Sequence, residues 1–252
     1  MCSSDLAEYT FRRNGGDRPS YGSIVGSGPN STTLHYNRDD RYMRAGEVLN
    51  MDMATYYGGY SADLTRTVPV SGKFSPEQRA VYDAVLAAQL AAERQVKVGG
   101  TYRQMNDSAV AVLTQELARL GLIEAPNATY DDHGRAVSQY RLYYMHGLGH
   151  PIGLDVHDVD VYAGPGGFVE GSAFTIEPGI YVRANTVDLI PDTPANAAVR
   201  AKLAPAVRKY ANVGVRIEDD YVVTAKGFDR ITADAPRDPD AIEREMAKRR
   251  GE

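Results

Sequence analysis

The sequence predicts an α+β fold, and three observations lead to this prediction. Stretches rich in Val, Thr and Ile lie on either side of two segments whose apolar residues have helical spacing. Hydrophobic residues make up 43% and charged residues 24% of the chain, as in an average globular protein, so wholesale disorder is excluded. The length of 252 residues fits a single domain of this class.

Charge, hydropathy and cysteine content exclude several classes of function. The chain has 28 Lys and Arg against 33 Asp and Glu, so it lacks the basic stripe that neutralises phosphates, and we expect no nucleic-acid partner. No window approaches the roughly 18 consecutive apolar residues of a membrane span, so we expect no membrane partner. Cys2 is the one cysteine, which excludes an intramolecular disulfide and a thiolate zinc site. Any bound metal therefore has oxygen and imidazole ligands.

The first residues bear on where the domain begins. They contain no apolar core of a signal peptide, so we expect a cytoplasmic protein, with an export signal upstream of residue 1 as the open alternative. The string CSSDL is also what a common sequencing-adapter end would encode. We therefore expect residues 1–7 to be an artefact or a disordered terminus, and residues 8–252 to form the domain.

The first β-prone region predicts antiparallel strands that carry two acids. Residues 47–53 (EVLNMDM) alternate polar and apolar side chains, which predicts a strand near whose end Asp52 lies. Residues 56–60 contain two glycines and predict a hairpin connection. Residues 61–70 are rich in Thr and Val and contain Asp63, so we expect a second, antiparallel strand there.

Two helices are predicted in the middle of the chain. Ser75, Pro76 and Gln78 form the pattern of a capping box with proline at the first helical position. Apolar residues then continue at helical spacing until Gly99. Residues 105–120 predict a second helix in the same way. We expect both helices to cover one face of a sheet, with their apolar stripes in the core.

Strands and turns return after residue 143. Residues 172–182 and 212–224 are β-prone, and residues 184–211 between them are rich in Ala and Pro, which predicts an insertion with a short helix. From Asp234 onward a turn containing proline precedes a charged terminal helix. Both β-rich regions bring acids, or an acid and a histidine, to strand ends. This repetition indicates a pseudo-duplicated architecture.

Four carboxylates lie among apolar residues, where surface charge is not expected. A buried carboxylate is costly unless it is paired, hydrogen-bonded or bound to a metal. One such acid is usually a satisfied core group or a turn former, but four of them beside a histidine cluster favour a metal site. They are Asp52, Asp63, Glu177 and Glu218. We expect the neighbouring Asp219 and Asp220 to be turn or surface acids.

The histidine cluster occupies residues 146–157, which contain three of the five histidines. Glycines separate His146 from His150 and allow the backbone to approach other groups closely. The two are four residues apart, as in a helical metal pair, but two glycines and a proline argue against a helix. We expect one of them to bind metal and the other to face the substrate.

Four strings resemble a known family when they are taken together and in this order. They are GYSADLTRT at residues 59–67, HGLGHPIGLDVHD at residues 146–158, TIEPGIY at residues 175–181 and VRIEDDYVVT at residues 215–224. They resemble the dinuclear metallopeptidases of the pita-bread fold, most closely the aminopeptidase P (Xaa-Pro aminopeptidase) and prolidase branch. The resemblance covers roughly residues 8–250. It implies a pseudo-duplicated antiparallel sheet covered by helices.

The resemblance also implies a set of metal ligands. Asp63 and Glu218 would bridge two ions, Asp52 would complete the site of one ion, and His150 with Glu177 would complete the other. A further group matches family positions that contact the substrate or stabilise the transition state. These are His35, His146, His157 and Arg216. Glu177 is expected to act in catalysis as well, as a proton shuttle from a bridging water to the leaving imide nitrogen.

The chemistry of these residues agrees with two divalent ions. Four carboxylates and one imidazole suit manganese and can accept zinc, cobalt or iron. Their charge of −4 balances two divalent ions, which would hold a bridging water and lower its pKa. His157 would donate a hydrogen bond to the tetrahedral oxyanion, and Arg216 would orient a ligand carboxylate.

The chain also departs from the family pattern. The string NMDMATYYGGY at residues 50–60 replaces the usual Asp-Ala-Gly, and residues 184–211 make the segment before Glu218 longer than expected. By this resemblance we also expect the family's N-terminal domain and first helices to be missing from the chain, which leaves open whether the chain is active.

The expected function is hydrolysis of peptides with proline at the second position, releasing the residue before it. Prolidase action on Xaa-Pro dipeptides is the near alternative. Methionine aminopeptidases share the fold, but the string LDVHD favours the proline-directed branch. A non-catalytic binding module is the alternative from another class, which the complete ligand set disfavours. A homo-oligomer is expected only if the full-length chain is present.

Overall fold

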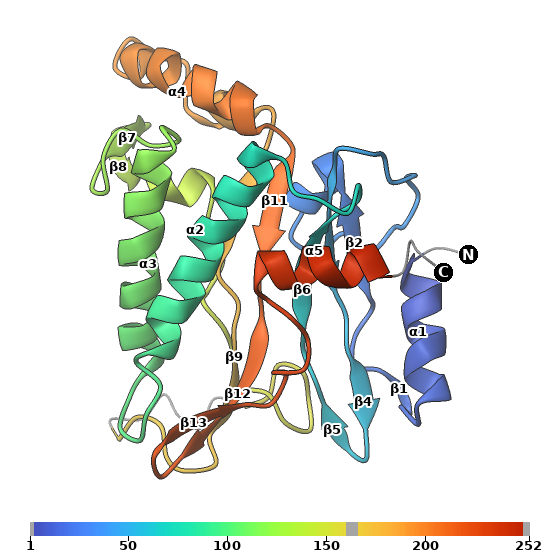
Figure 1. Ribbon diagram of the computed structural model, residues 1–252. Helices are drawn as coiled ribbons and strands as arrows, with labels where there is room; N and C mark the ends of the chain where they lie inside the picture. Colours follow the sequence, from blue (N-terminus) through green and yellow to red (C-terminus); the bar gives the residue numbers. More distant parts are fainter. Residues whose placement is uncertain (1–2, 160–165, 249–252) are drawn as a thin grey trace.

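The computed structural model describes residues 3–159 and 166–248, in which antiparallel strands are covered by helices (Figure 1). The helices are α1 (Ser3–Arg13), α2 (Pro76–Glu93), α3 (Tyr102–Arg119), α4 (Ala197–Tyr210) and α5 (Pro239–Lys248). The strands of the first half are β1 (Arg18–Pro19), β2 (Ile24–Ser27), β3 (Val48–Asp52), β4 (Thr55–Tyr57), β5 (Tyr60–Ser61) and β6 (Thr65–Pro69). Those of the second half are β7 (Thr129–Asp132), β8 (Arg135–Ser138), β9 (Ala173–Ile176), β10 (Gly179–Val182), β11 (Val213–Arg216), β12 (Asp219–Thr224) and β13 (Gly227–Arg230).

The sheet has two antiparallel halves. Strands β2, β3 and β6 form one half in the order β2-β3-β6, and the other contains β13-β12-β9 and the pair β10-β11. The pairs β9–β12 and β10–β11 keep the same register, so they form one ladder that is interrupted at Glu177 and Glu218. The two residues therefore lie opposite each other. The expected pseudo-duplicated antiparallel architecture is confirmed.

The two halves of the sheet meet between β6 and β11. The Glu218 N–H donates to the Thr65 carbonyl at 3.1 Å. The Arg216 N–H donates to the Thr67 hydroxyl at 3.1 Å, and that hydroxyl donates to the Arg216 carbonyl at 3.0 Å. Residues of β6 thus form hydrogen bonds with the end of β11 and with Glu218. These bonds join the two halves of the sheet next to the candidate ligands.

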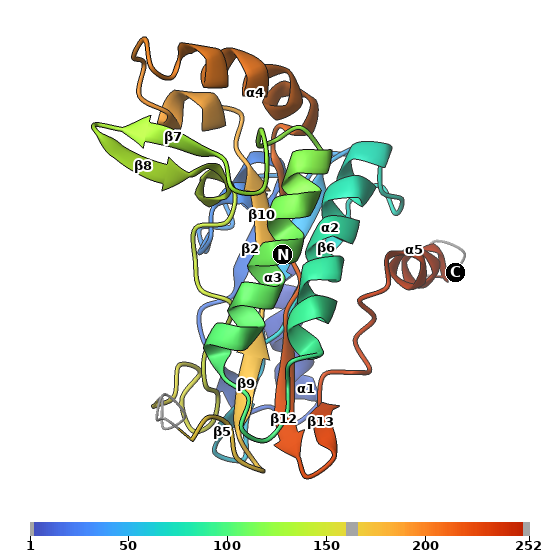
Figure 2. The same cartoon turned by 90° about the vertical axis from the view of Figure 1, so that its left-hand side faces the viewer.

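Helices α2 and α3 cover one face of the second half of the sheet (Figure 2). The predicted capping box of α2 is confirmed, because the Gln78 N–H donates to Ser75 Oγ at 3.2 Å and the Ser75 N–H donates to Gln78 Oε1 at 2.9 Å. However, α2 ends at Glu93, before the predicted stop at Gly99. The chain continues in turns from Arg94 to Gly99, whose N–H donates to the Phe168 carbonyl at 2.7 Å.

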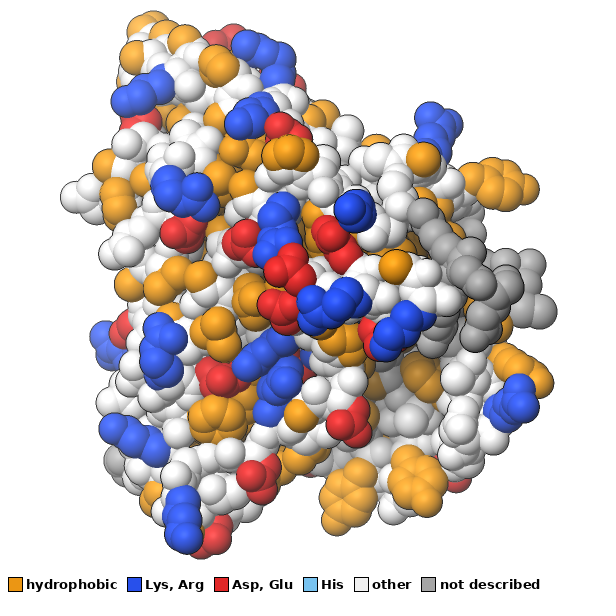
Figure 3. Space-filling view, viewed as in Figure 1, with side chains coloured by type: hydrophobic (Ala, Val, Ile, Leu, Met, Phe, Trp, Pro, Cys, Tyr) orange, Lys and Arg blue, Asp and Glu red, His pale blue; other side chains and the backbone are white. Residues whose placement is uncertain are grey.

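Charged side chains of both signs lie on the surface (Figure 3). On the face that Figure 3 shows, acidic and basic side chains are interspersed. One ion pair, between Arg79 Nη1 and Asp240 Oδ1 at 2.6 Å, joins α2 to α5. The terminal helix predicted after Asp234 is therefore present and is anchored to the central helix layer.

The predicted insertion contains a longer helix than expected. Helix α4 spans 14 residues and includes Pro205. The insertion is tied to the β7–β8 hairpin, because the Asp131 N–H donates to Asn196 Oδ1 at 3.0 Å and Asn196 Nδ2 donates to the Asp131 carbonyl at 2.8 Å. Figure 2 shows α4 and this hairpin at the same end of the molecule. The hairpin itself was not predicted.

Helix α1 precedes the first strand, so residues 3–7 are helical, and the alternative that residues 1–7 are an artefact stays a prediction. Asp5 lies in the first turn of α1 and Arg12 and Arg13 in its last turn, an arrangement that complements the helix dipole. The Ser4 hydroxyl also donates to Asp39 Oδ2 at 2.7 Å, which ties the helix to the loop before β3.

Among residues 3–159 and 166–248, we find no helix that is both long and apolar enough to cross a membrane.

Candidate metal centre

One cavity of about 480 Å³ collects every residue that the sequence singled out for the site. Its lining includes the nine predicted side chains, His35, Asp52, Asp63, His146, His150, His157, Glu177, Arg216 and Glu218. They come from both halves of the sheet and from the loops between strands. The structure therefore brings together residues that lie up to about 180 positions apart in the sequence, as the metal-site hypothesis requires.

The candidate ligands lie at strand ends or breaks. Asp52 is the last residue of β3, and Asp63 lies between β5 and β6. Glu177 and Glu218 lie at the interruption of the long ladder in the second half. At such positions the backbone no longer continues the regular pairing, so side chains can converge instead of alternating between the two faces of a sheet.

His150 is held by a close approach of its loop to β9. The Thr175 N–H donates to the His150 carbonyl at 2.9 Å, and the His150 N–H donates to the Thr175 hydroxyl at 3.1 Å. A Cβ atom added to Gly149 would collide with the Thr175 carbonyl, whereas one added to Gly147 would meet nothing within 4 Å. Glycine is thus required at one of the two positions of the His-Gly-Leu-Gly-His string.

The donor atoms suit a cation. One ligand atom each of Asp63, His150 and Glu218 lie within 4.8 Å of one another. His150 Nδ1 lies 3.0 Å from the Pro151 carbonyl, and Nε2 lies 3.4 Å from both Asp63 Oδ2 and Glu177 Oε1. An imidazole nitrogen facing two carboxylates is favourable only with a proton or a cation between them. Hard oxygen and imidazole donors without thiolate fit a divalent metal.

Burial raises the pKa of three of the candidate carboxylates in the metal-free chain. Burial raises the pKa of Glu177 to about 8, against the charge of His150, which lowers it. Burial and then the nearby charge of Asp63 raise the pKa of Glu218 well above its usual range. Burial also raises the pKa of Asp52, although the Arg216 guanidinium opposes this. A cluster of buried carboxylates with raised pKa values is typical of a site that binds cations.

The three histidines of the cluster have different environments. Burial lowers the pKa of His150, but the hydrogen bond to Asp63 and the charge of Glu177 outweigh burial and raise it to about 9. Burial and the Arg216 charge lower the pKa of His146 to about 4, so its ring is neutral at pH 7. His157 is exposed at the cavity wall, with its ring centroid 4.0 Å from that of His150.

Arg216 contacts the carboxylate of the candidate ligand Asp52. Its Nη2 atom lies 2.5 Å from Asp52 Oδ2, and both side chains are buried. The remaining guanidinium nitrogens donate to the Tyr181 hydroxyl at 2.9 Å and to the Thr65 hydroxyl at 3.2 Å. The guanidinium is thus held by hydrogen bonds on several sides and fixes the orientation of Asp52.

Sequence reasoning missed two hydroxyl side chains that contact the candidate ligands and a third, that of Tyr181, which contacts His146 and Arg216. The Tyr21 hydroxyl lies 2.5 Å from both Asp52 Oδ1 and Asp63 Oδ1. The Thr65 hydroxyl donates to Glu218 Oε2 at 2.6 Å. Thr65, like Tyr181, lies inside one of the family strings, where proximity to a ligand could have indicated it. Tyr21 lies far from every string, and nothing in the sequence distinguishes it from the other tyrosines.

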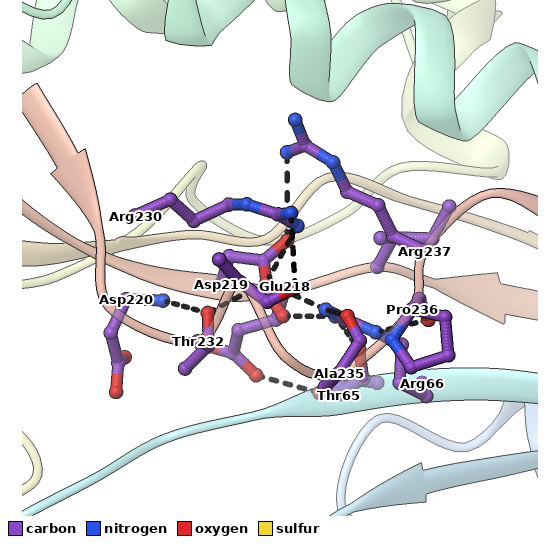
Figure 4. Close-up of polar contacts among 12 residues, drawn as sticks. Thr65, Arg66, Glu218, Asp219, Asp220, Arg230, Thr232, Ala235, Pro236 and Arg237 are labelled. Carbon is purple, nitrogen blue, oxygen red and sulfur yellow. Dashed lines mark hydrogen bonds and ion pairs between the residues drawn. The ribbon is translucent and has the colours of Figure 1, made fainter.

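The expectation that Asp219 and Asp220 are turn or surface acids is wrong. Both lie in β12 and are 0% and 1% exposed. Figure 4 shows the Asp219 carboxylate among arginine side chains that come from separate parts of the chain. The expectation failed because an Asp pair in a string is usually solvated, whereas here β13 and the C-terminal segment cover this strand.

Comparison with known proteins shows which family the chain resembles in sequence. The model of metallopeptidase family M24 matches residues 2–225 of the chain. The Xaa-Pro aminopeptidase of Escherichia coli strain K12 is 35% identical over 244 residues, which cover 96% of this chain and 50% of that protein. Xaa-Pro aminopeptidase 1 of Streptomyces coelicolor is 37% identical over 245 residues, which cover 94% of this chain and 45% of that protein.

The solved structures that the chain matches include aminopeptidases P. A variant of Escherichia coli aminopeptidase P in complex with substrate has a TM-score of 0.82 at 32% identity, covering 100% of this chain and 53% of that one. Pseudomonas aeruginosa aminopeptidase PepP has a TM-score of 0.81 at 36% identity, covering 100% and 54%. The chain spans about half the length of the curated relatives it matches. With the family model matching most of its length, this chain belongs to metallopeptidase family M24.

Proposed function

We propose that this chain is a dinuclear metal-dependent peptidase that releases the N-terminal residue preceding proline. The observation that carries the proposal is the convergence of Asp63, His150 and Glu218, whose ligand atoms lie within 4.8 Å of one another in the cavity. Relatives named Xaa-Pro aminopeptidase, which match nearly the whole chain, support the substrate class.

The proposed ligands are five of the residues that line the cavity and carry oxygen or imidazole donors. They are Asp52, Asp63, His150, Glu177 and Glu218. Asp63 and Glu218 would be shared between two cations, as the resemblance to the family implies, and each has a donor atom within 4.8 Å of one of His150. Two divalent cations would supply a water nucleophile at neutral pH and polarise the scissile carbonyl. Manganese is proposed first, with zinc, cobalt or iron as alternatives, since the donor set has no thiolate.

The remaining predicted residues would act on the substrate. Glu177 would carry a proton from the water to the leaving imide nitrogen, because it lines the cavity beside His150. His157 would donate a hydrogen bond to the oxyanion, and His35 and His146 would contact the substrate from the cavity wall. Arg216 would hold Asp52 in place through their 2.5 Å contact.

Two other functions remain distinguishable by experiment. A prolidase would prefer Xaa-Pro dipeptides, whereas the relatives that match nearly the whole chain are named Xaa-Pro aminopeptidase, which supports the proposed reaction. A non-catalytic binding module would have no need of the five converging donors. We further propose a cytoplasmic enzyme whose partners are peptides with proline at the second position. Assembly into a homo-oligomer stays a prediction for a full-length chain.

The proposal is tested by metal analysis and peptide hydrolysis on the purified chain, with and without Mn²⁺. We expect about two metal ions per chain and cleavage of Ala-Pro-Ala in preference to both Ala-Pro and Ala-Ala-Ala. Asp63→Ala and Glu218→Ala should lower kcat/KM by about 10³-fold or more. Glu170→Ala, at an exposed acid outside the cavity, should leave it unchanged.

Three results would contradict the proposal in different ways. Hydrolysis that persists in a chelator, or that Glu218→Ala does not lower, would exclude the metal mechanism. Faster cleavage of Ala-Pro than of Ala-Pro-Ala would indicate a prolidase. Metal binding without hydrolysis of any of the three peptides would indicate a binding module.

A further inference from the structure

The strand that follows Glu218 contains a buried acid with no assigned role. Asp220 is 1% exposed and follows Asp219 in β12, so its side chain points to the opposite face of the strand from that of Asp219. Consistent with this alternation, Asp219 Oδ2 accepts a hydrogen bond from Gln89 of α2 at 3.0 Å.

Asp220 makes one side-chain hydrogen bond among the described residues. Its Oδ2 atom accepts the backbone N–H of Asp63 at 3.1 Å, and its Oδ1 atom has no hydrogen-bond partner there. Burying a carboxylate with so few hydrogen bonds lowers the stability of the fold. An acid at this position therefore indicates a role for its hydrogen bond with the Asp63 N–H. The contact connects two segments that are 157 positions apart in the sequence.

The Asp63 backbone depends on this contact. Asp63 lies in the segment between β5 and β6, outside the strand ladders, and its side chain is one of the three that converge on the candidate metal position. A buried N–H without an acceptor costs about 1–3 kcal/mol, so the segment would shift to find another acceptor if Asp220 were removed. A shift of the backbone moves the carboxylate with it.

Asp220 itself is held on a fixed support. The carboxylate of its neighbour Asp219 lies 2.6 Å from Arg66 Nη2 and accepts the Thr232 hydroxyl at 2.6 Å. Arg66 Nη1 also donates to the Glu218 carbonyl at 2.6 Å and to the Thr65 carbonyl at 2.9 Å (Figure 4). This network fixes the start of β12 against the start of β6, so the Asp220 carboxylate has a defined position from which to hold the opposite segment.

We propose that Asp220 is a positioning residue that holds the candidate metal ligand Asp63 through its backbone N–H. It does not bind the metal in this arrangement; it sets the distance between the Asp63 and Glu218 carboxylates. The inference rests on the proposed function, because it requires Asp63 to be a ligand. Residues that orient metal ligands typically change metal affinity or activity by 10–100-fold when they are removed.

The experiment compares Asp220→Ala with Asp220→Asn in the whole chain. Asparagine keeps an oxygen that can accept the Asp63 N–H but carries no charge, whereas alanine leaves that N–H without an acceptor. Mn²⁺ affinity is measured by titration calorimetry well below the unfolding midpoint of each variant. We expect Asp220→Ala to weaken Mn²⁺ binding by about 10–100-fold and Asp220→Asn by about threefold or less. Hydrogen exchange of the Asp63 amide should become faster in the alanine variant alone.

A neighbouring residue provides the matched control. The Tyr221 hydroxyl is buried in the same strand and donates to Glu93 at 2.9 Å, away from the cavity. Tyr221→Phe should lower the unfolding midpoint but leave Mn²⁺ affinity unchanged, which separates positioning from general destabilisation.

The outcomes distinguish this inference from the proposed function. If the parent chain binds no Mn²⁺, the proposed function is wrong and the inference is lost with it. If the parent binds Mn²⁺ and Asp220→Ala binds it equally well, only the positioning role is overturned. Should alanine prevent folding, Asp220→Asn alone decides the question, because a large loss of affinity in that variant would show that the charge matters rather than the backbone contact.

Discussion

Glu177 and Glu218 lie opposite each other where the antiparallel ladder between β9–β10 and β11–β12 is interrupted. Because regular pairing stops there, both carboxylates can face the same cavity. Two carboxylates buried in one cavity are costly to ionise together without a cation. The free energy of unfolding of the chain therefore depends on their protonation.

The metal-free chain should therefore lose stability as the pH rises from about 6.5 to 9. Burial raises the pKa of Glu177 to about 8, and the contacts with Asp63 and Glu177 raise that of His150 to about 9. The folded chain then keeps protons that the unfolded chain releases, so the free energy of unfolding falls with pH in this window. His146, whose pKa is lowered to about 4, acts in the opposite direction only below pH 6.5.

Thermal unfolding in a chelator, followed by circular dichroism across this pH range, measures the effect. Mn²⁺ favours the deprotonated ligands, so the stabilisation that it provides should increase with pH. An unfolding midpoint in chelator that stays constant or rises between pH 6.5 and 9 would contradict the protonation states described here.

Replacing Arg216 should affect both activity and stability. The guanidinium is buried, and it contacts Asp52, Tyr181 and Thr65 through separate nitrogens. Arg216→Lys keeps the charge but has one nitrogen, so we expect a 10–100-fold loss of kcat/KM. Arg216→Ala leaves the Asp52 charge uncompensated and should cost about 3–5 kcal/mol of unfolding free energy in the metal-free chain.

The surface pair Arg103–Asp107 provides the control for that prediction. Its atoms are 3.8 Å apart and its side chains are 91% and 67% exposed, so Arg103→Ala should change neither quantity measurably. Equal effects of Arg216→Ala and Arg103→Ala in urea unfolding would mean that the buried pair has no special role.

Tyr21→Phe tests the hydroxyl that joins two candidate ligands. The hydroxyl has one proton, so it can donate to Asp52 or to Asp63 but not to both at once, although each carboxylate lies 2.5 Å away. Removing it frees both carboxylates while the aromatic ring still fills its place. We expect about a tenfold weaker Mn²⁺ affinity with an almost unchanged unfolding midpoint in the absence of metal. Tyr57→Phe, at an exposed tyrosine, is the control, and equal affinities in both variants would exclude the positioning role of Tyr21.

Features that depend on residues close together in the sequence, such as the start of α2, could be predicted from local patterns. The capping box at Ser75 and Gln78 depends on residues three positions apart, and it was predicted correctly because its partners are local. The convergence of Asp52 with Arg216 was predictable only through the resemblance to a known family, since no local pattern links strands so far apart.

Other features depend on tertiary contacts that the sequence does not encode locally. Asp219 and Asp220 were expected at the surface, because an acidic pair has no apolar periodicity to indicate burial. Their burial follows from covering segments such as the one around Ala235 and Pro236, whose carbonyls accept hydrogen bonds from Arg66. A role for Tyr21 could not be predicted for the same reason, because its partners lie on other strands.

The two glycines of the His-Gly-Leu-Gly-His string give the last prediction. The sequence suggested that both allow close backbone approach, but only Gly149 lies against another backbone, at the Thr175 carbonyl. Gly149→Ala must push the loop away from β9, which breaks the two hydrogen bonds between His150 and Thr175 and moves the imidazole. We expect a loss of several kcal/mol in unfolding free energy and at least a tenfold loss of Mn²⁺ affinity.

Gly147→Ala makes the same chemical change two positions earlier, where an added Cβ meets nothing within 4 Å. It should leave metal affinity and the unfolding midpoint close to those of the parent, because the loop has room for the methyl group. Urea unfolding and calorimetric titration of both variants make the comparison. If Gly149→Ala behaved like Gly147→Ala, the contact between this loop and β9 would not be what positions His150, and another element would have to hold the imidazole near Asp63 and Glu177.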